Sequence, residues 1–125
     1  MHSEWRILLV EDDPDGQAVV AHVLDYLQIA ADVASNAEEA EAYLFGSENA
    51  YNSVIIDLSL PGKDGWELLS AILHDPVTAE IPCIAITAYH TSILREEAIQ
   101  AGFNAYFAKP LDTNAFMREL EALLR

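Results

Sequence analysis

Short apolar runs alternate with longer segments of helical periodicity along the 125 residues of the chain, and this alternation constrains the fold most. Apolar runs of about four to six residues are too short for buried helices and are typical of strands. Strands that alternate with helices form a parallel sheet, because a parallel neighbour is reached only through a crossover connection. The expected strands are Arg6–Val10, Ala31–Ala34, Ser53–Leu58, Cys83–Thr87 and Ala105–Ala108.

The segments between these strands place apolar residues at helical spacing and carry helix start and stop signals. The expected helices are Pro14–Leu27, a second from a Ser35 cap to about Phe45, Gly65–Leu73, a fourth that ends at Gly102, and Asn114–Leu124. The expected N-caps are Ser35 in a capping box with Glu38, Asp64 with Glu67, Thr91 or Ser92, and Asp112 or Thr113. Five βα units predict a doubly wound α/β fold in one domain that spans residues 1–125.

The charge balance excludes some partners. Six Lys and Arg face 21 Asp and Glu, for a formal net charge of −15, which repels nucleic acid phosphates and anionic lipid headgroups. We therefore expect neither direct nucleic acid binding nor membrane binding. No apolar run approaches the roughly 20 residues that a spanning helix needs, and no leader pattern is present, so a cytoplasmic protein is expected. The single cysteine, Cys83, lies in an apolar run and is expected in the core.

Polar residues stand where the expected strands end. Glu11 and Asp12 follow the first strand, Asp57 lies at the end of the third, Thr87 ends the fourth, and Lys109 follows the fifth. The carboxyl ends of parallel strands share one edge of a sheet, and functional residues of open α/β folds gather there. Each residue also has an ordinary explanation, since Asp12 or Asp13 could simply cap the first helix. Their joint occurrence at strand ends favours a site.

Several carboxylates at one sheet edge repel one another unless a cation neutralises them. A hard divalent ion fits this need, and Mg²⁺ is favoured because it binds few carboxylates and keeps several waters. Lys109 can meet a phosphoryl oxygen and the Thr87 hydroxyl can donate to another. The pattern therefore predicts a phosphoryl acceptor site in which Asp57 is the nucleophile and Glu11 and Asp12 hold the metal.

Four segments, ILLVEDD, VIIDLSLPGKDG, CIAITA and YFAKPLD, resemble the signature segments of bacterial receiver domains of two-component response regulators, in the same order. The resemblance covers essentially the whole chain. It implies a flavodoxin-like five-stranded parallel sheet with strand order 2-1-3-4-5. It also implies Asp57 as phosphoacceptor, and Mg²⁺ held by Glu11, Asp12, Asp57 and the backbone carbonyl of Ser59.

The resemblance further implies a switch. Thr87 and Tyr106 would be its moving residues, with Thr87 shifting toward the phosphoryl group and Tyr106 turning inward, and Lys109 would contact the phosphate. A cis peptide bond is implied between Lys109 and Pro110. The implied partners are a sensor histidine kinase or a histidine phosphotransfer protein. The implied partners also include a second copy of the chain, bound through the fourth helix, the fifth strand and the fifth helix.

Other classes of protein share parts of this pattern. A flavin or nucleotide binder of the same strand order needs a phosphate-cradling loop after the first strand, but the loop here reads EDDPDG. A phosphoaspartate hydrolase needs a second carboxylate two residues after the nucleophile, where this chain has Ser59. A receiver-like module without phosphorylation would lack the acceptor residues. We therefore expect a domain that is not an enzyme on external substrates but assists only its own phosphorylation and dephosphorylation.

Overall fold

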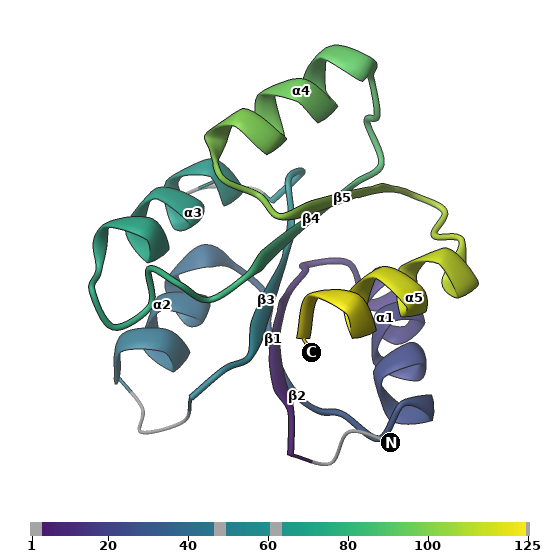
Figure 1. Cartoon of the computed structure of the whole chain (residues 1–125), viewed down its shortest axis with the longest axis horizontal. Coiled ribbons are helices and arrows are strands. Elements are labelled where there is room, and N and C mark those ends of the chain that lie inside the picture. The colour runs from purple at the N-terminus through teal and green to yellow at the C-terminus, as the bar shows by residue number, and fades with distance from the viewer. Residues whose placement is uncertain (1–3, 47–49, 61–63, 125) are drawn as a thin grey trace.

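The structure, a computed structural model, describes residues 4–46, 50–60 and 64–124. Five strands alternate with five helices in this part of the chain (Figure 1). In order they are β1 (Arg6–Val10), α1 (Pro14–Tyr26), β2 (Ala30–Ala34), α2 (Ala37–Gly46), β3 (Ser53–Asp57), α3 (Gly65–His74), β4 (Cys83–Thr87), α4 (Ser92–Ala101), β5 (Ala105–Ala108) and α5 (Thr113–Leu124). All ten expected elements are present; β1, β4 and β5 have the expected ends, and the ends of the others differ by about one residue.

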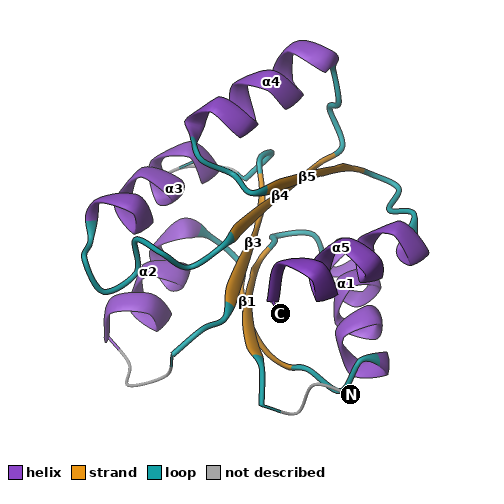
Figure 2. Cartoon of the chain, in the orientation of Figure 1, coloured by secondary structure: helices purple, strands orange, loops and turns teal. Residues whose placement is uncertain are grey.

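The strands form one parallel sheet in the order β2-β1-β3-β4-β5, as expected. Helices cover both faces, with α1 and α5 on one side and α2, α3 and α4 on the other (Figure 2). Both β3 and β4 are buried along their whole length, which explains why their sequences are apolar nearly throughout. The predicted doubly wound fold is confirmed.

The sheet separates two apolar clusters, because successive side chains of a strand point to opposite faces. Leu8 and Val10 belong to the cluster that includes residues of α2, α3 and α4. Ile7 and Leu9 belong to the cluster that includes residues of α1 and α5. Cys83 is buried in the first cluster, as expected, and burial raises the pKa of its thiol to about 12. Among the described residues, none of the helices has the length and apolar character needed to cross a membrane.

The helix starts agree with the expected caps except in α2. Asp64 and Thr91 accept backbone N–H bonds at the starts of α3 and α4, and Asp112 accepts from the Ala115 N–H at the start of α5. The prediction of a Ser35 cap with Glu38 is wrong by one residue. Asn36 accepts from the Glu39 N–H, and the Glu39 carboxylate accepts from the Ser35 N–H. Both registers have a polar residue three positions before a Glu, so the sequence pattern fits either.

The core against α5 allows a stability test. Phe116 is fully buried and packs edge-on against Phe107 with ring centroids 5.0 Å apart, whereas Phe45 on α2 is 43% exposed. We predict that Phe116→Ala lowers the free energy of unfolding by roughly 3–5 kcal/mol, because it removes a buried ring and leaves a cavity. The matched variant Phe45→Ala should cost less than about 1 kcal/mol. Urea denaturation of both variants measures the difference, and equal costs would contradict the described packing.

Candidate functional site

The polar residues at the strand ends lie together at one edge of the sheet. Val10 pairs with Ile56, Asp57 with Ile86 and Thr87 with Ala108, so the ends of β1, β3, β4 and β5 are aligned. Glu11, Asp57 and Thr87 are buried, while Asp12 is exposed. A buried carboxylate needs a partner to remain charged. At this edge of the sheet the fold therefore shields the carboxylates of Glu11 and Asp57 from water.

Three carboxylates converge there. Glu11, Asp12 and Asp57 each offer one carboxylate oxygen, and these oxygens all lie within 4.8 Å of one another. An all-oxygen set of acids suits a hard cation such as Mg²⁺ or Ca²⁺ and does not suit the softer ions that select thiolates. The three residues named from the sequence as metal holders are thus brought together by the fold.

Lys109 supplies the positive charge. Its Nζ donates to Oδ2 of Asp57 at 3.1 Å and also to Oε1 of Glu11. Burial alone would lower the pKa of Lys109, but hydrogen bonds to the two carboxylates outweigh it and hold the pKa above its ordinary value. The ammonium therefore stays charged. The peptide bond between Lys109 and Pro110 is cis, as the resemblance implies.

Asp57 lies at the centre of these contacts. Its Oδ1 accepts from the Ser59 backbone N–H at 2.9 Å and from the Ser59 hydroxyl at 2.7 Å, while its Oδ2 accepts from Lys109. Burial would raise the pKa of Asp57, but hydrogen bonds from Glu11 and Ser59 and the charge of Lys109 outweigh it and lower the pKa. Asp57 is therefore ionised and able to act as a nucleophile.

Glu11 is the site carboxylate whose pKa is raised by burial. Burial, followed by the neighbouring Asp57 carboxylate, raises its pKa to about 7, although Lys109 acts in the opposite direction. The Asp13 backbone N–H lies 3.4 Å from its Oε2, and the Gln17 side-chain amide donates to its backbone carbonyl at 2.6 Å. Near neutral pH the pair of Glu11 and Asp57 holds its negative charge mainly on Asp57.

Two glycines and a glutamine have roles that the sequence analysis missed. A Cβ at Gly16 would lie 2.8 Å from Cδ of Glu11, and a Cβ at Gly65 would lie 3.1 Å from the Asp57 carbonyl oxygen and 2.7 Å from Cγ2 of Ile56. Both glycines therefore let the first turn of a helix approach a site residue closely. Gln17 is bonded to Glu11 across six positions of the chain. The sequence does contain a signal for these three residues: each lies near the start of a helix that follows an acidic residue at a strand end.

Asp13, one of the two residues that the sequence offers as a cap of the first helix, caps α1. Its side chain accepts from the Gly16 N–H at 3.1 Å. Asp13 is also exposed and is not among the three converging carboxylates. Residues 61–63, which form part of the signature segment after β3, lie outside the described residues.

The two residues expected to move lie on neighbouring strands. The Thr87 hydroxyl accepts from the Tyr89 backbone N–H at 3.0 Å. Tyr106 is only 4% exposed, and its hydroxyl lies 3.1 Å from Nδ1 of His90. The Tyr106 ring is thus already buried in this arrangement, and the switching movement that the resemblance implies stays a prediction.

Comparison with known proteins agrees with this geometry. The family model for the response regulator receiver domain matches residues 7–121. The chain is 34% identical to an uncharacterized 14.6 kDa protein of Leptolyngbya boryana, over 93% of this chain and 87% of that protein. It is 32% identical to the transcriptional regulatory protein ResD of Bacillus subtilis, over 98% of this chain and 49% of ResD. The chain thus spans about half the length of that regulator.

A solved structure is similar throughout. The receiver domain of the sensor histidine kinase PA1611 from Pseudomonas aeruginosa, solved with a magnesium ion coordinated in its active site cleft, superimposes with a TM-score of 0.82. It is 30% identical, and the match covers 96% of this chain and 97% of that one. Fold, strand-end chemistry and family model agree, and this chain belongs to the response regulator receiver domain family.

Proposed function

We propose that this chain is a signalling switch that accepts a phosphoryl group on Asp57 in a Mg²⁺-dependent reaction. The observation that carries the proposal is the Asp57 carboxylate, which is buried, ionised and in contact with Lys109, within 4.8 Å of carboxylate oxygens of Glu11 and Asp12. The phosphodonor would be a sensor histidine kinase or a histidine phosphotransfer protein. The magnesium ion in the related receiver domain of PA1611 supports the choice of metal.

The reaction forms a bond between an Asp57 carboxylate oxygen and phosphorus, and breaks the bond from phosphorus to the donor imidazole nitrogen, which leaves with the bonding electrons. Lys109 is placed to neutralise charge on the transferred group, because its Nζ already contacts Asp57. A Mg²⁺ ion held by Glu11, Asp12 and Asp57, with the Ser59 backbone carbonyl as a further ligand, would supply Lewis acidity and align the group. The Ser59 donors fix the orientation of the carboxylate before transfer.

The chain assists only its own phosphorylation and dephosphorylation in this proposal. Hydrolysis would require water to reach the aspartyl phosphate. Ser59 is partly buried beside Asp57, and Tyr89, which is 73% exposed, stands two residues beyond Thr87. These two positions, two residues beyond Asp57 and two beyond Thr87, are expected to tune the lifetime of the phosphoryl group.

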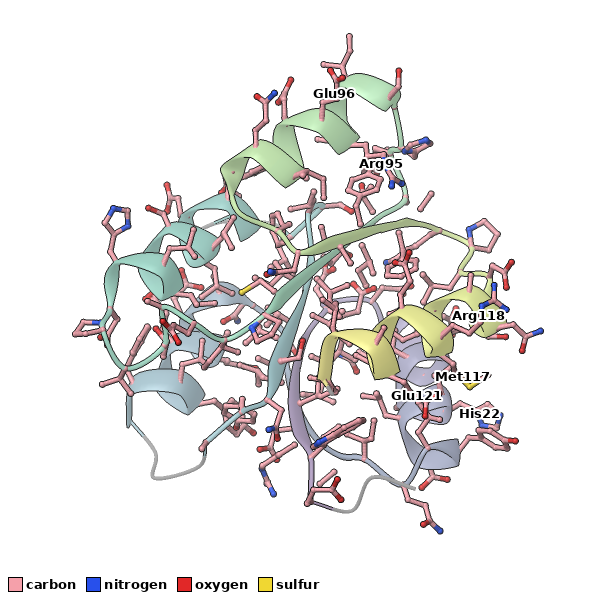
Figure 3. All side chains as sticks on the ribbon, in the orientation of Figure 1. His22, Arg95, Glu96, Met117, Arg118 and Glu121 are labelled. Carbon is pink, nitrogen blue, oxygen red and sulfur yellow. The ribbon has the colours of Figure 1, made fainter. Side chains whose placement is uncertain are left out.

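The output surface in this proposal is formed by α4, β5 and α5. Helix α4 exposes Ile93 by 67% and Ile99 by 44%, and Ala98 is its fully buried residue, so the helix is lightly anchored and able to shift. Arg95 on α4 and Arg118 on α5 are two of the six Lys and Arg residues of this acidic chain, and the same helices carry Glu96 and Glu121 (Figure 3). A partner protein, or a second copy of the chain, would dock here. We expect the protein to act in the cytoplasm, without contact to nucleic acid or membrane.

Metal binding is tested with two exposed acids near β1. We predict that Asp12→Asn weakens Mg²⁺ binding by roughly tenfold or more, because it removes one of the three converging carboxylates. Asp15→Asn, which removes an equal charge outside the carboxylate cluster, should change the affinity less than about twofold. Titration of Trp66 fluorescence with Mg²⁺ measures both, since Trp66 follows Gly65, which lies against the Asp57 backbone. Equal losses of affinity in the two variants would show that the overall negative charge of the region attracts Mg²⁺ and that Asp12 is not a ligand.

Phosphoryl acceptance is tested by intact mass after treatment with a small acyl phosphate and Mg²⁺. We predict that the wild-type chain gains the mass of one phosphoryl group and that Asp57→Asn gains none, because an amide is not a nucleophile here. Asp25→Asn, an exposed acid on α1, should behave as the wild type. Excess chelator should abolish the added mass. An undiminished phosphorylated peak in Asp57→Asn would refute the assignment of Asp57.

The switch is tested by separating acceptance from response. We predict that Thr87→Ala still accepts the phosphoryl group on Asp57 but shows a roughly fivefold smaller change in amide hydrogen exchange across residues 89–106, because it lacks the hydroxyl that would bond the phosphate. Thr87→Ser keeps a hydroxyl and should retain most of the response. Hydrogen exchange with and without the phosphodonor measures this. A full response in Thr87→Ala would show that the hydroxyl is not the link.

A further inference from the structure

The loop between β4 and α4, residues 88–91, is tied at two points to residues of the switch. At its start, the Tyr89 backbone N–H donates to the Thr87 hydroxyl at 3.0 Å. One residue later, Nδ1 of His90 lies 3.1 Å from the Tyr106 hydroxyl. The side chains of Tyr89 and His90 are exposed, whereas Thr87 and Tyr106 are buried. The loop therefore connects two buried residues on adjacent strands through its own hydrogen bonds.

Tyr106 is held in place from two sides. Its ring packs against the His90 imidazole with ring centroids 5.5 Å apart and planes inclined at 52°. The Arg95 guanidinium carbon lies 5.9 Å from the centre of the Tyr106 ring, and Arg95 extends from α4 toward β5 (Figure 3). Burial, opposed by the charge of Arg95, raises the pKa of the Tyr106 hydroxyl. The hydroxyl thus remains protonated and needs a hydrogen-bond partner, which His90 provides.

We propose that His90 is the positioning residue that couples Thr87 to Tyr106, by holding the Tyr106 hydroxyl from the same loop that Thr87 anchors. This inference rests on the proposed phosphorylation switch and adds to it a specific mechanical link. His90 touches neither Asp57 nor the metal-holding carboxylates in the described contacts. It would therefore act on the response to phosphorylation and not on phosphoryl transfer.

The direction of the coupling follows from the hydrogen bonds. The Thr87 hydroxyl has one hydrogen to donate, and a phosphoryl group on Asp57 offers strong acceptors on the neighbouring strand. If Thr87 moves toward that group, the loop either follows it through the bond from Tyr89 or is released when that bond breaks. A shift of His90 then breaks or redirects its bond to Tyr106. Because Tyr106 lies under Arg95, the change reaches α4.

Variants at position 90 separate the hydrogen bond from the ring packing. His90→Phe keeps an aromatic ring beside Tyr106 but removes the polar atom, while His90→Asn loses the ring and keeps polar atoms at about the position of Nδ1. The wild-type chain and the two variants are each phosphorylated on Asp57 with a small acyl phosphate, and intact mass measures the extent of phosphorylation. Amide hydrogen exchange at residues 88–91 and 104–108 is then compared between the two states of each protein.

We expect equal phosphorylation in all three proteins and a phosphorylation-dependent change at residues 104–108 that is roughly fivefold smaller in His90→Phe. His90→Asn should restore most of the change. A full response in His90→Phe, or no restoration in His90→Asn, would overturn the assigned role of the hydrogen bond. If the wild-type chain takes no phosphoryl group, the proposed function itself fails, and that outcome is distinct because it appears in the mass measurement alone.

Discussion

The balance of charge among Glu11, Asp57 and Lys109 is the constraint on which the rest of the site depends. Two buried carboxylates share one ammonium group, and the three residues come from the ends of β1, β3 and β5. Neither carboxylate could stay charged in that position without the cation. The balance is reached only when strands far apart in the sequence are in register, so the site exists only in the assembled sheet.

Close backbone approach is the second requirement. The first turns of α1 and α3 lie against site residues at Gly16 and Gly65, where a larger side chain would meet Glu11 or Asp57. Helix starts also bring backbone N–H groups to the edge of the sheet, as Asp13 does toward Glu11. The site is thus shaped as much by residues without side chains as by its charged groups.

The sequence predicted the ten elements, the parallel sheet and the convergence of acids, because apolar periodicity and strand-end position follow directly from the chain. It placed the α2 cap one residue early, since Ser35 with Glu38 and Asn36 with Glu39 satisfy the same pattern. It could not reveal the bond between Tyr106 and His90, because that bond depends on side-chain packing between β5 and the loop before α4. Such contacts have no periodicity to read.

The separation of the core into two clusters by the sheet has a consequence for divergence within this family. On β5, Tyr106 packs with the cluster of α2, α3 and α4, while its neighbours Ala105 and Phe107 pack with that of α1 and α5. Substitutions on the two faces share few contacts, and distant substitutions act nearly independently. The interior of each cluster can therefore change with little effect on the other, whereas the proposed output surface of α4, β5 and α5 draws on both clusters and constrains them together.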